Sequence, residues 1–171
     1  FRRWPEPRTH DIASAIRHSG VPCKVAADLM HARWEKLVWN IPFNGLGVAS
    51  RAGYEALASG VSPKNVSAKC LTTSELLADP AWCQLVHELM HEVILAANTQ
   101  GLALPEELAG KMIQLTRNMG GYRASTVLDF EAGRPIELET IFLEPLRRAE
   151  AANIPVPRLR ALCNLLTQLA P

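Results

Sequence analysis

Start and stop signals for α-helices recur along this sequence, whereas patterns that favour β-strands are almost absent. Asp28 can cap a long apolar helix, and Asp79-Pro80 is a strong N-cap with a proline in the first turn, after which the helix extends to about Asn98. Nowhere do Val, Ile, Thr and aromatic residues alternate for more than a few positions. The sequence therefore predicts an all-α fold, a bundle of six to eight helices.

Other turn signals place the remaining helices. Thr9 can cap a helix that stops near Gly20. The helix that Asp28 opens is expected to kink around Pro42, and a loop is expected over residues 60–65. Four later helices are expected over residues 104–119, 125–130, 136–152 and 157–171.

Length and composition fit one globular domain over residues 1–171. The chain has a mass of 18.8 kDa, with 48% apolar and 20% charged residues, which is typical of soluble proteins with a hydrophobic core. Its net charge of +1 gives no field that attracts nucleic acid or an anionic membrane, and no apolar run could span a bilayer. We expect neither partner, and a cytoplasmic location. Residue 1 is Phe rather than Met, which indicates processing or a piece of a longer chain.

The four cysteines form no metal or redox motif. Cys23, Cys70, Cys83 and Cys163 include no pair with C-x-x-C spacing. The last three have apolar neighbours, which is typical of small core residues. We expect reduced thiols and no bound metal.

Residues 87–91 spell H-E-x-x-H, which on a helix places two imidazoles on one face, as in zinc proteases. The H-x-x-G-x-x-H extension fails, because Ile94 and Ala97 stand where Gly and the third His are required. An amphipathic helix with solvent-facing His87 and His91 explains the spacing, and a zinc hydrolase is the less favoured alternative. The residues expected to pack inward are Leu85, Leu89, Val93 and Ala96.

Gly45-Leu46-Gly47, followed by Ser50, nearly matches the dinucleotide-binding pattern G-x-G-x-x-G. That pattern follows a buried strand and precedes an acidic residue by about 20 positions. Here the preceding segment is predicted helix, and Asn65 stands at the acidic position. The chain therefore carries no Rossmann fingerprint of its own.

Lys36, Asn40 and Asn44 recur at intervals of four residues, which places them on one face of a helix. Their neighbours between Trp34 and Phe43 are nearly all apolar, and asparagine is a poor helix former. A lysine held away from water in such a stripe is a competent proton donor near neutral pH, and amides suit a ligand with carbonyl, hydroxyl and carboxylate oxygens. A narrow solvated face of a packed helix is the alternative.

A second polar cluster follows between residues 124 and 139. Ser125 and Asp129 lie one turn apart on a helix that Gly133 ends. Glu137 then falls in the first turn of the next helix, where the helix dipole favours an acid. Asp129 is expected to be a structural partner of Arg134 or a helix cap.

These segments resemble the ketopantoate reductase family. W-E-K-L-V-W-N-I-P-F-N-G-L, at residues 34–46, resembles the family's W-x-K-L-x-x-N-x-x-x-N-x-L. A-S-T-V-L-D-F-E-A-G-R-P-I-E-L-E-T-I, at 124–141, is similar to S-M-x-x-D-x-x-x-G-R-x-T-E-I-D-x-I, and N-I-P-V-P, at 153–157, is similar to G-I-P-T-P. The resemblance covers most of the chain and implies the helical C-terminal domain, a bundle like the C-terminal domain of 6-phosphogluconate dehydrogenase. The family's N-terminal Rossmann domain would be absent from this chain.

The resemblance implies a role for each matched residue. Lys36 matches the lysine that protonates the ketone oxygen as hydride arrives from NADPH. Asn40 and Asn44 match asparagines that orient the 2-keto acid. Ser125 matches a substrate-binding serine, and Glu137 matches an acid that contacts the nucleotide.

Several positions depart from the family's pattern. Ile136 replaces a threonine, Thr126 a methionine, and Leu143 and Glu144 replace a glycine. Tyr54 stands where some members carry a further substrate-contacting asparagine. These departures weaken the identification of ketopantoate as the substrate, and Tyr54 is the first position expected to alter it.

The resemblance thus implies one half of an NADPH-dependent 2-dehydropantoate 2-reductase, which converts ketopantoate to pantoate in pantothenate and coenzyme A biosynthesis. The expected partners are a 2-keto acid, the chain's own N-terminal Rossmann domain and a second copy in a homodimer. The isolated domain is expected to be inactive. The alternative is a non-catalytic helical interaction or dimerisation module, in which Lys36, Asn40 and Asn44 are solvated and individually replaceable.

Overall fold

The computed structural model describes residues 4–59 and 69–170, and this part of the chain contains nine α-helices and no strand. The all-α prediction is confirmed. A 3-10 turn, η1 (Ser50–Ala52), follows the second helix, and a π-helical turn, η2 (Leu138–Leu143), precedes the eighth. The helices are α1 (Pro7–His18), α2 (Leu29–Ala49), α3 (Tyr54–Ser59), α4 (Thr73–Ala78), α5 (Pro80–Thr99), α6 (Leu108–Arg117), α7 (Ser125–Glu131), α8 (Glu144–Ala151) and α9 (Pro157–Leu169).

Helix ends follow local capping signals in most places. Asp28 accepts hydrogen bonds from the first-turn N–H groups of α2, and Asp79 does the same for α5, as predicted. Thr9 is not a cap, because α1 already begins at Pro7. The short helices α3 and α4 account for the difference from the six to eight helices expected, and the predicted loop over 60–65 lies outside the described residues.

The segment after residue 104 also differs from the expected helix boundaries. Pro105 precedes a turn at residues 106–107, and α6 begins only at Leu108 and ends at Arg117. Between α7 and α8 the chain forms η2 rather than the start of one continuous helix, so Glu137 precedes the first turn instead of lying in it. Both differences lengthen the connections that surround α7.

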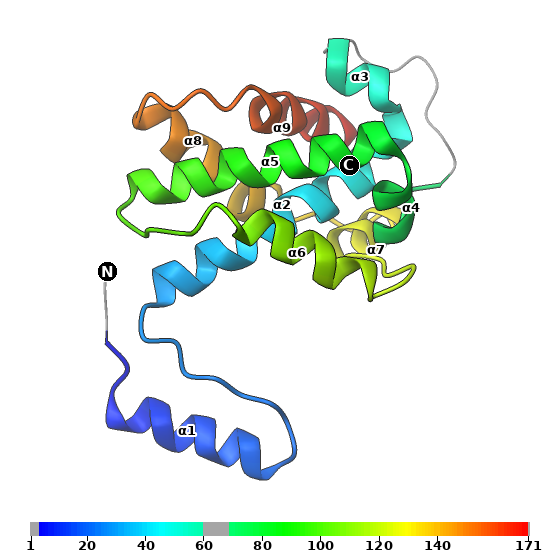
Figure 1. The fold of residues 1–171 in the computed structure, drawn as a ribbon. Coiled ribbons are helices and arrows are strands. Elements are labelled where there is room, and N and C mark those ends of the chain that lie inside the picture. Colours follow the sequence, from blue (N-terminus) through cyan, green and yellow to red (C-terminus); the bar gives the residue numbers. More distant parts are fainter. Residues whose placement is uncertain (1–3, 60–68, 171) are drawn as a thin grey trace.

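Helices α2 and α5 form the centre of the bundle and pack most extensively against each other, while α4, α6 and α9 each contact both of them (Figure 1). The core between them is apolar, and its larger side chains are almost completely buried. Each such side chain contributes about 1.5–3 kcal/mol of transfer free energy on burial. The largest include Trp34, Ile41, Phe43, Leu89, Met90, Phe142 and Leu162.

The two glycines of the near-fingerprint are sites of close helix packing. A Cβ atom at Gly45 would lie 2.6 Å from Cδ2 of Leu162 and 2.8 Å from Cε1 of Phe142. One at Gly47 would lie 2.5 Å from Cγ2 of Val127. These two glycines therefore let α9, η2 and α7 approach α2. Pro42 does not interrupt α2, which remains helical from Leu29 to Ala49.

Helix α1 and the segment that follows it lie apart from the bundle (Figure 1). Ala13 is its one buried residue, while Ile12 and Ile16 remain 52% and 36% exposed. A single domain over residues 1–171 therefore stays a prediction. Among the described helices, none has the length and apolarity needed to cross a bilayer.

All four cysteines are free. Cys70 and Cys163 are buried and Cys83 packs against the edge of the core, as expected of small apolar residues. Burial raises the pKa of the Cys163 thiol to about 12. This thiol therefore stays protonated at physiological pH.

Candidate functional site

One cavity of about 420 Å³ brings together the five residues that were expected to bind or act on a ligand. Its size falls within the range of about 300–1,000 Å³ that is usual for small-molecule sites. Helix α2 supplies three of the residues, α7 supplies one, and the connection before η2 supplies one. They are Lys36, Asn40, Asn44, Ser125 and Glu137.

The polar row of α2 becomes more buried along the helix. Lys36 is exposed, Asn40 is half-buried, and Asn44 is only 1% exposed. Successive members are separated by a rise of about 6 Å, because an α-helix rises 1.5 Å per residue. The expectation that Lys36 is held away from water is wrong for this chain, since its side chain is open to solvent. Any shielding of the lysine must come from a ligand or from another part of the protein.

Asn44 has a structural role that the sequence did not reveal. Its side-chain oxygen accepts a hydrogen bond of 2.9 Å from the backbone N–H of Thr126, in the first turn of α7. The residue before α7 is Ala124, which has no side-chain acceptor, so Asn44 provides the missing cap from a neighbouring helix. The side-chain oxygen of Asn44 is thus already engaged in a hydrogen bond within the fold.

The amide nitrogen of Asn44 has no hydrogen-bond partner within the part of the chain that the structure describes. Because the oxygen of this amide faces Thr126, the NH₂ group is the part of the Asn44 side chain that can contact a ligand in the cavity. Asn44 can therefore act toward a ligand only as a donor. Such a donor suits a carboxylate, carbonyl or hydroxyl oxygen.

Ser125 and Glu137 add one hydroxyl and one carboxylate to the cavity, and both residues are exposed. Asp129, by contrast, does not line the cavity. Its carboxylate accepts a hydrogen bond of 2.8 Å from Nε of Arg134, and its backbone oxygen accepts from the Arg134 N–H. The prediction that Asp129 is a structural partner of Arg134 is confirmed.

The cavity also has an apolar wall that sequence reasoning missed. The wall consists of Trp39, Met112, Met119 and Tyr122. Trp39 could have been suspected, because it lies beside Asn40 on α2, but the other three come from α6 and the loop after it. No local pattern indicates that this loop meets α2.

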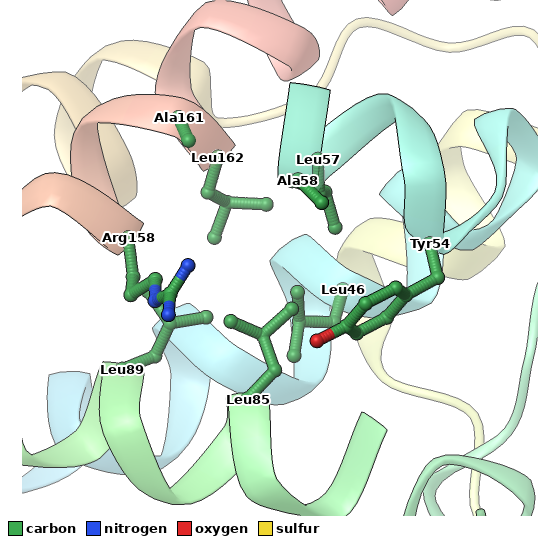
Figure 2. Close-up of a pocket in the computed structure, with 9 residues that line it drawn as sticks. All are labelled: Leu46, Tyr54, Leu57, Ala58, Leu85, Leu89, Arg158, Ala161 and Leu162. Carbon is green, nitrogen blue, oxygen red and sulfur yellow. The ribbon is translucent and has the colours of Figure 1, made fainter. Parts of the chain in front are cut away.

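Tyr54 lies in a different pocket (Figure 2). That pocket has a cavity volume of about 10 Å³, which is at the lower limit for holding one water molecule, and leucines from four helices surround it. Figure 2 shows the Tyr54 ring beside Leu46 and Leu85, and the ring also packs edge-on against Trp82 with centroids 5.4 Å apart. Tyr54 does not line the cavity that contains Lys36, so the structure gives no support to its expected influence on the substrate.

The H-E-x-x-H segment lies on the outer face of α5. Nε2 of His87 and Nε2 of His91 are 3.3 Å apart, and Glu88 forms an ion pair of 2.8 Å with Arg158 instead of facing the histidines. The predicted inward residues, Leu85, Leu89, Val93 and Ala96, are all buried. Within the described residues, no group of three His, Cys, Asp or Glu side chains could hold a metal ion. The amphipathic interpretation of this helix is confirmed.

Glu92, one residue beyond this segment, is a second buried cap. Its two carboxylate oxygens accept hydrogen bonds of 2.9 and 2.8 Å from the N–H groups of Arg158 and Leu159, in the first turn of α9. Burial raises the pKa of Glu92, although these hydrogen bonds and the charge of Arg158 act in the opposite direction. Both oxygens serve the fold, so Glu92 is no free acid for catalysis.

Among the described residues, the glycines of α2 and Glu137 are the groups that bear on nucleotide binding. The Gly45 and Gly47 positions are filled by neighbouring side chains and cannot cradle a phosphate. Glu137 is exposed at the cavity, where its carboxylate can accept a hydrogen bond from a hydroxyl or amide.

Comparison with known proteins shows a consistent family. The model described as "Ketopantoate reductase PanE/ApbA C terminal" matches residues 58–170. A 2-dehydropantoate 2-reductase of Nostoc sp. is 32% identical over 93% of this chain and 44% of its own length. The chain thus spans between about a third and a half of the length of the curated relatives it matches.

Solved structures that resemble this chain belong to the same family. A 2-dehydropantoate 2-reductase from Geobacter metallireducens has a TM-score of 0.79 and 37% identity, over 96% of this chain and 49% of that one. Another from Methylococcus capsulatus has a TM-score of 0.80 and 28% identity, over 97% and 47%. The helical bundle is therefore shared with about one half of each of these proteins.

Proposed function

This chain belongs to the ketopantoate reductase family, and we propose that it forms the substrate-binding half of a reductase that converts the ketone of a 2-keto acid into a hydroxyl group with NADPH. The observation that supports this most directly is the gathering of Lys36, Asn40, Asn44, Ser125 and Glu137 around one cavity. Ketopantoate, which the family's name carries, is the first 2-keto acid to test. Its reduction to pantoate would place the protein in pantothenate and coenzyme A biosynthesis.

Lys36 is the proposed general acid. When bound, NADPH supplies a hydride to the ketone carbon, and negative charge then develops on the ketone oxygen. The Lys36 ammonium donates a hydrogen bond to that oxygen, stabilises the charge and transfers a proton to it. Its present exposure leaves Nζ accessible to a substrate that enters the cavity from solvent.

The remaining polar residues would hold the substrate in position. The free NH₂ group of Asn44 and the amide of Asn40 donate to oxygens of the 2-keto acid, and the Ser125 hydroxyl binds its carboxylate. Glu137 accepts a hydrogen bond from the nucleotide. The nucleotide phosphates require a Rossmann domain N-terminal to this chain, and without that domain we expect no turnover.

The test is Lys36→Ala in a full-length protein that contains this chain together with its Rossmann domain. We expect kcat with NADPH and a 2-keto acid to fall roughly 100-fold or more, because a positioned general acid contributes about that much. The free energy of unfolding should change by less than about 0.5 kcal/mol, since Lys36 is exposed. Lys111→Ala, at an exposed lysine of α6 that does not line the cavity, is the matched control. Wild-type activity in Lys36→Ala would refute the assignment.

A non-catalytic interaction module is the second candidate, and the exposure of Lys36 favours it. On that hypothesis single replacements of Lys36 and Asn40 change neither stability nor any activity. The reductase hypothesis also carries two further expectations, a homodimer and a cytoplasmic location. The mass of the full-length protein in solution, measured by light scattering, tests the first.

A further inference from the structure

The apolar wall of the cavity bears on which 2-keto acid fits. We propose that the preferred substrate carries a bulky aromatic side chain, which packs against Trp39, Met112, Met119 and Tyr122 while the carboxylate and ketone face the polar row of α2. This inference rests on the proposed function and specifies the substrate class of the same site. It starts from the division of the cavity into one polar and one apolar side.

Trp39 is fixed in its orientation. Its indole N–H donates a hydrogen bond of 2.8 Å to the hydroxyl oxygen of Thr116, and its ring lies 5.0 Å from the ring of Phe43. Thr116 in turn donates to the backbone oxygen of Met112 over 2.7 Å. With the N–H engaged in this way, Trp39 has only apolar ring surface to present to a ligand.

The Thr116 hydroxyl is closed to a hydroxylated substrate by its burial, because its proton is engaged and its one free lone pair is not open to the cavity. It already accepts from Trp39 and donates to Met112, and Thr116 is only 1% exposed. A side-chain hydroxyl, such as that of ketopantoate, would lose its water and gain no partner from this wall unless it reached the Tyr122 phenol. Burying an unpaired hydroxyl costs about 1–3 kcal/mol, so the wall favours a side chain without one.

Tyr122 is held against Trp39 by the loop that carries it. Thr73, at the start of α4, donates from its hydroxyl to the backbone oxygens of Gly120 and Tyr122, each over 3.1 Å, and from its N–H to the Tyr122 oxygen over 3.0 Å. The Tyr122 and Trp39 rings meet edge-on with centroids 6.0 Å apart. The loop is therefore anchored, and an aromatic edge is in place before any ligand arrives.

The solvent exposure of two side chains of the apolar wall supports the binding of a ligand there. Tyr122 and Met119 are both 45% exposed, which is high for large apolar side chains that line a cavity. A substrate ring between them would cover this apolar surface, and aromatic pairs and methionine–aromatic contacts each contribute favourably beyond burial. No charged side chain lies on this wall; the two charged residues of the cavity, Lys36 and Glu137, come from α2 and the connection before η2.

The experiment compares kcat/KM for phenylpyruvate and ketopantoate in the full-length reductase with NADPH. We expect phenylpyruvate to be favoured at least 10-fold. Tyr122→Ala should lower the phenylpyruvate-to-ketopantoate ratio of kcat/KM at least 5-fold. Tyr54→Ala, which removes the chain's other tyrosine from the separate pocket of Figure 2, should leave that ratio unchanged.

The outcomes separate this inference from the proposed function. A preference for ketopantoate, or a ratio that Tyr122→Ala does not move, would overturn the aromatic assignment while the reductase function stands. If neither acid is reduced, the proposed function fails, and calorimetric binding of the two acids to the same protein then decides the pocket's preference. Tighter binding of ketopantoate than of phenylpyruvate would reject the inference in that case as well.

Discussion

The two central helices, α2 and α5, are alike in length and in the spacing of their polar residues, and they differ in what surrounds those residues. Each has about 20 residues and carries polar side chains four positions apart, Lys36-Asn40-Asn44 on α2 and His87-His91 on α5. Around the row of α2, the neighbouring segments α6, α7 and η2 leave a cavity of about 420 Å³. Around the histidines there is solvent and an ion pair between Glu88 and Arg158. Spacing therefore locates a face of a helix, and the neighbouring elements decide whether that face becomes a site.

The same helices each cap another helix with a buried side chain. Asn44 caps α7, whose own preceding residue is Ala124, and Glu92 caps α9, whose preceding residue is Val156. Glu92 uses both of its oxygens, whereas Asn44 uses one atom and keeps its NH₂ group. The cap on α5 is thus purely structural, and the cap on α2 can also bind a ligand.

Replacement of Glu92 should have the largest effect on stability. Glu92→Ala leaves the N–H groups of Arg158 and Leu159 without their acceptors at the start of α9, so we expect the free energy of unfolding to fall by about 3 kcal/mol. Urea denaturation of this chain measures the change. Glu88→Ala is the control on the same helix: it removes a partly exposed ion pair with Arg158 and an exposed hydrogen bond from Gln84, and it should cost less than about 1 kcal/mol. Equal losses in the two variants would show that Glu92 is no cap.

Asn44 should show a smaller loss of stability together with a loss of binding. Asn44→Ala leaves one N–H, that of Thr126, without its acceptor, and we expect a loss of about 1–2 kcal/mol in the same urea experiment. Asn44→Asp keeps an acceptor for Thr126 but replaces the NH₂ donors with a second oxygen. It should therefore lose less stability than Asn44→Ala.

The two Asn44 variants should rank in the opposite order for the substrate. In the full-length reductase, Asn44→Asp places a negative charge near an anionic 2-keto acid, so its KM should rise at least as much as that of Asn44→Ala. A variant that restores stability and also restores KM would mean that Asn44 serves the fold alone. Asn44 would then be a purely structural cap, like Glu92.

How much the sequence reveals depends on whether a signal is local. Asp28 and Asp79 cap the helices that directly follow them, so both helix starts could be predicted. The caps from Asn44 and Glu92 join residues 82 and 67 positions apart, and no local pattern indicates either pairing. The row on α2 was predicted from its periodicity, but the exposure of Lys36 depends on what covers that end of the helix.

The apolar wall of the cavity could not be predicted for the same reason: it depends on contacts between residues far apart in the sequence. Met119 and Tyr122 reach the cavity from the loop after α6, which is tied to Thr73, a residue of α4 that precedes this loop by more than 40 positions. Met112 reaches it from α6 itself. In the sequence these residues are indistinguishable from other apolar positions. Tyr54 was expected to matter from its place in the family's pattern, yet the chain turns after α2 and carries it to another pocket.

The smallest effect is expected on α5. His87→Ala combined with His91→Ala removes the two imidazoles whose Nε2 atoms lie 3.3 Å apart, on a surface whose neighbours are solvent and the Glu88–Arg158 pair. The free energy of unfolding should change by less than about 0.5 kcal/mol, because no buried group depends on either ring. In the full-length protein kcat should stay at its wild-type value, since neither histidine lines the cavity of α2. Elemental analysis of the purified wild-type protein provides the second readout: one equivalent of zinc that is lost from the double variant would give α5 a site of its own and end the contrast between the two helices.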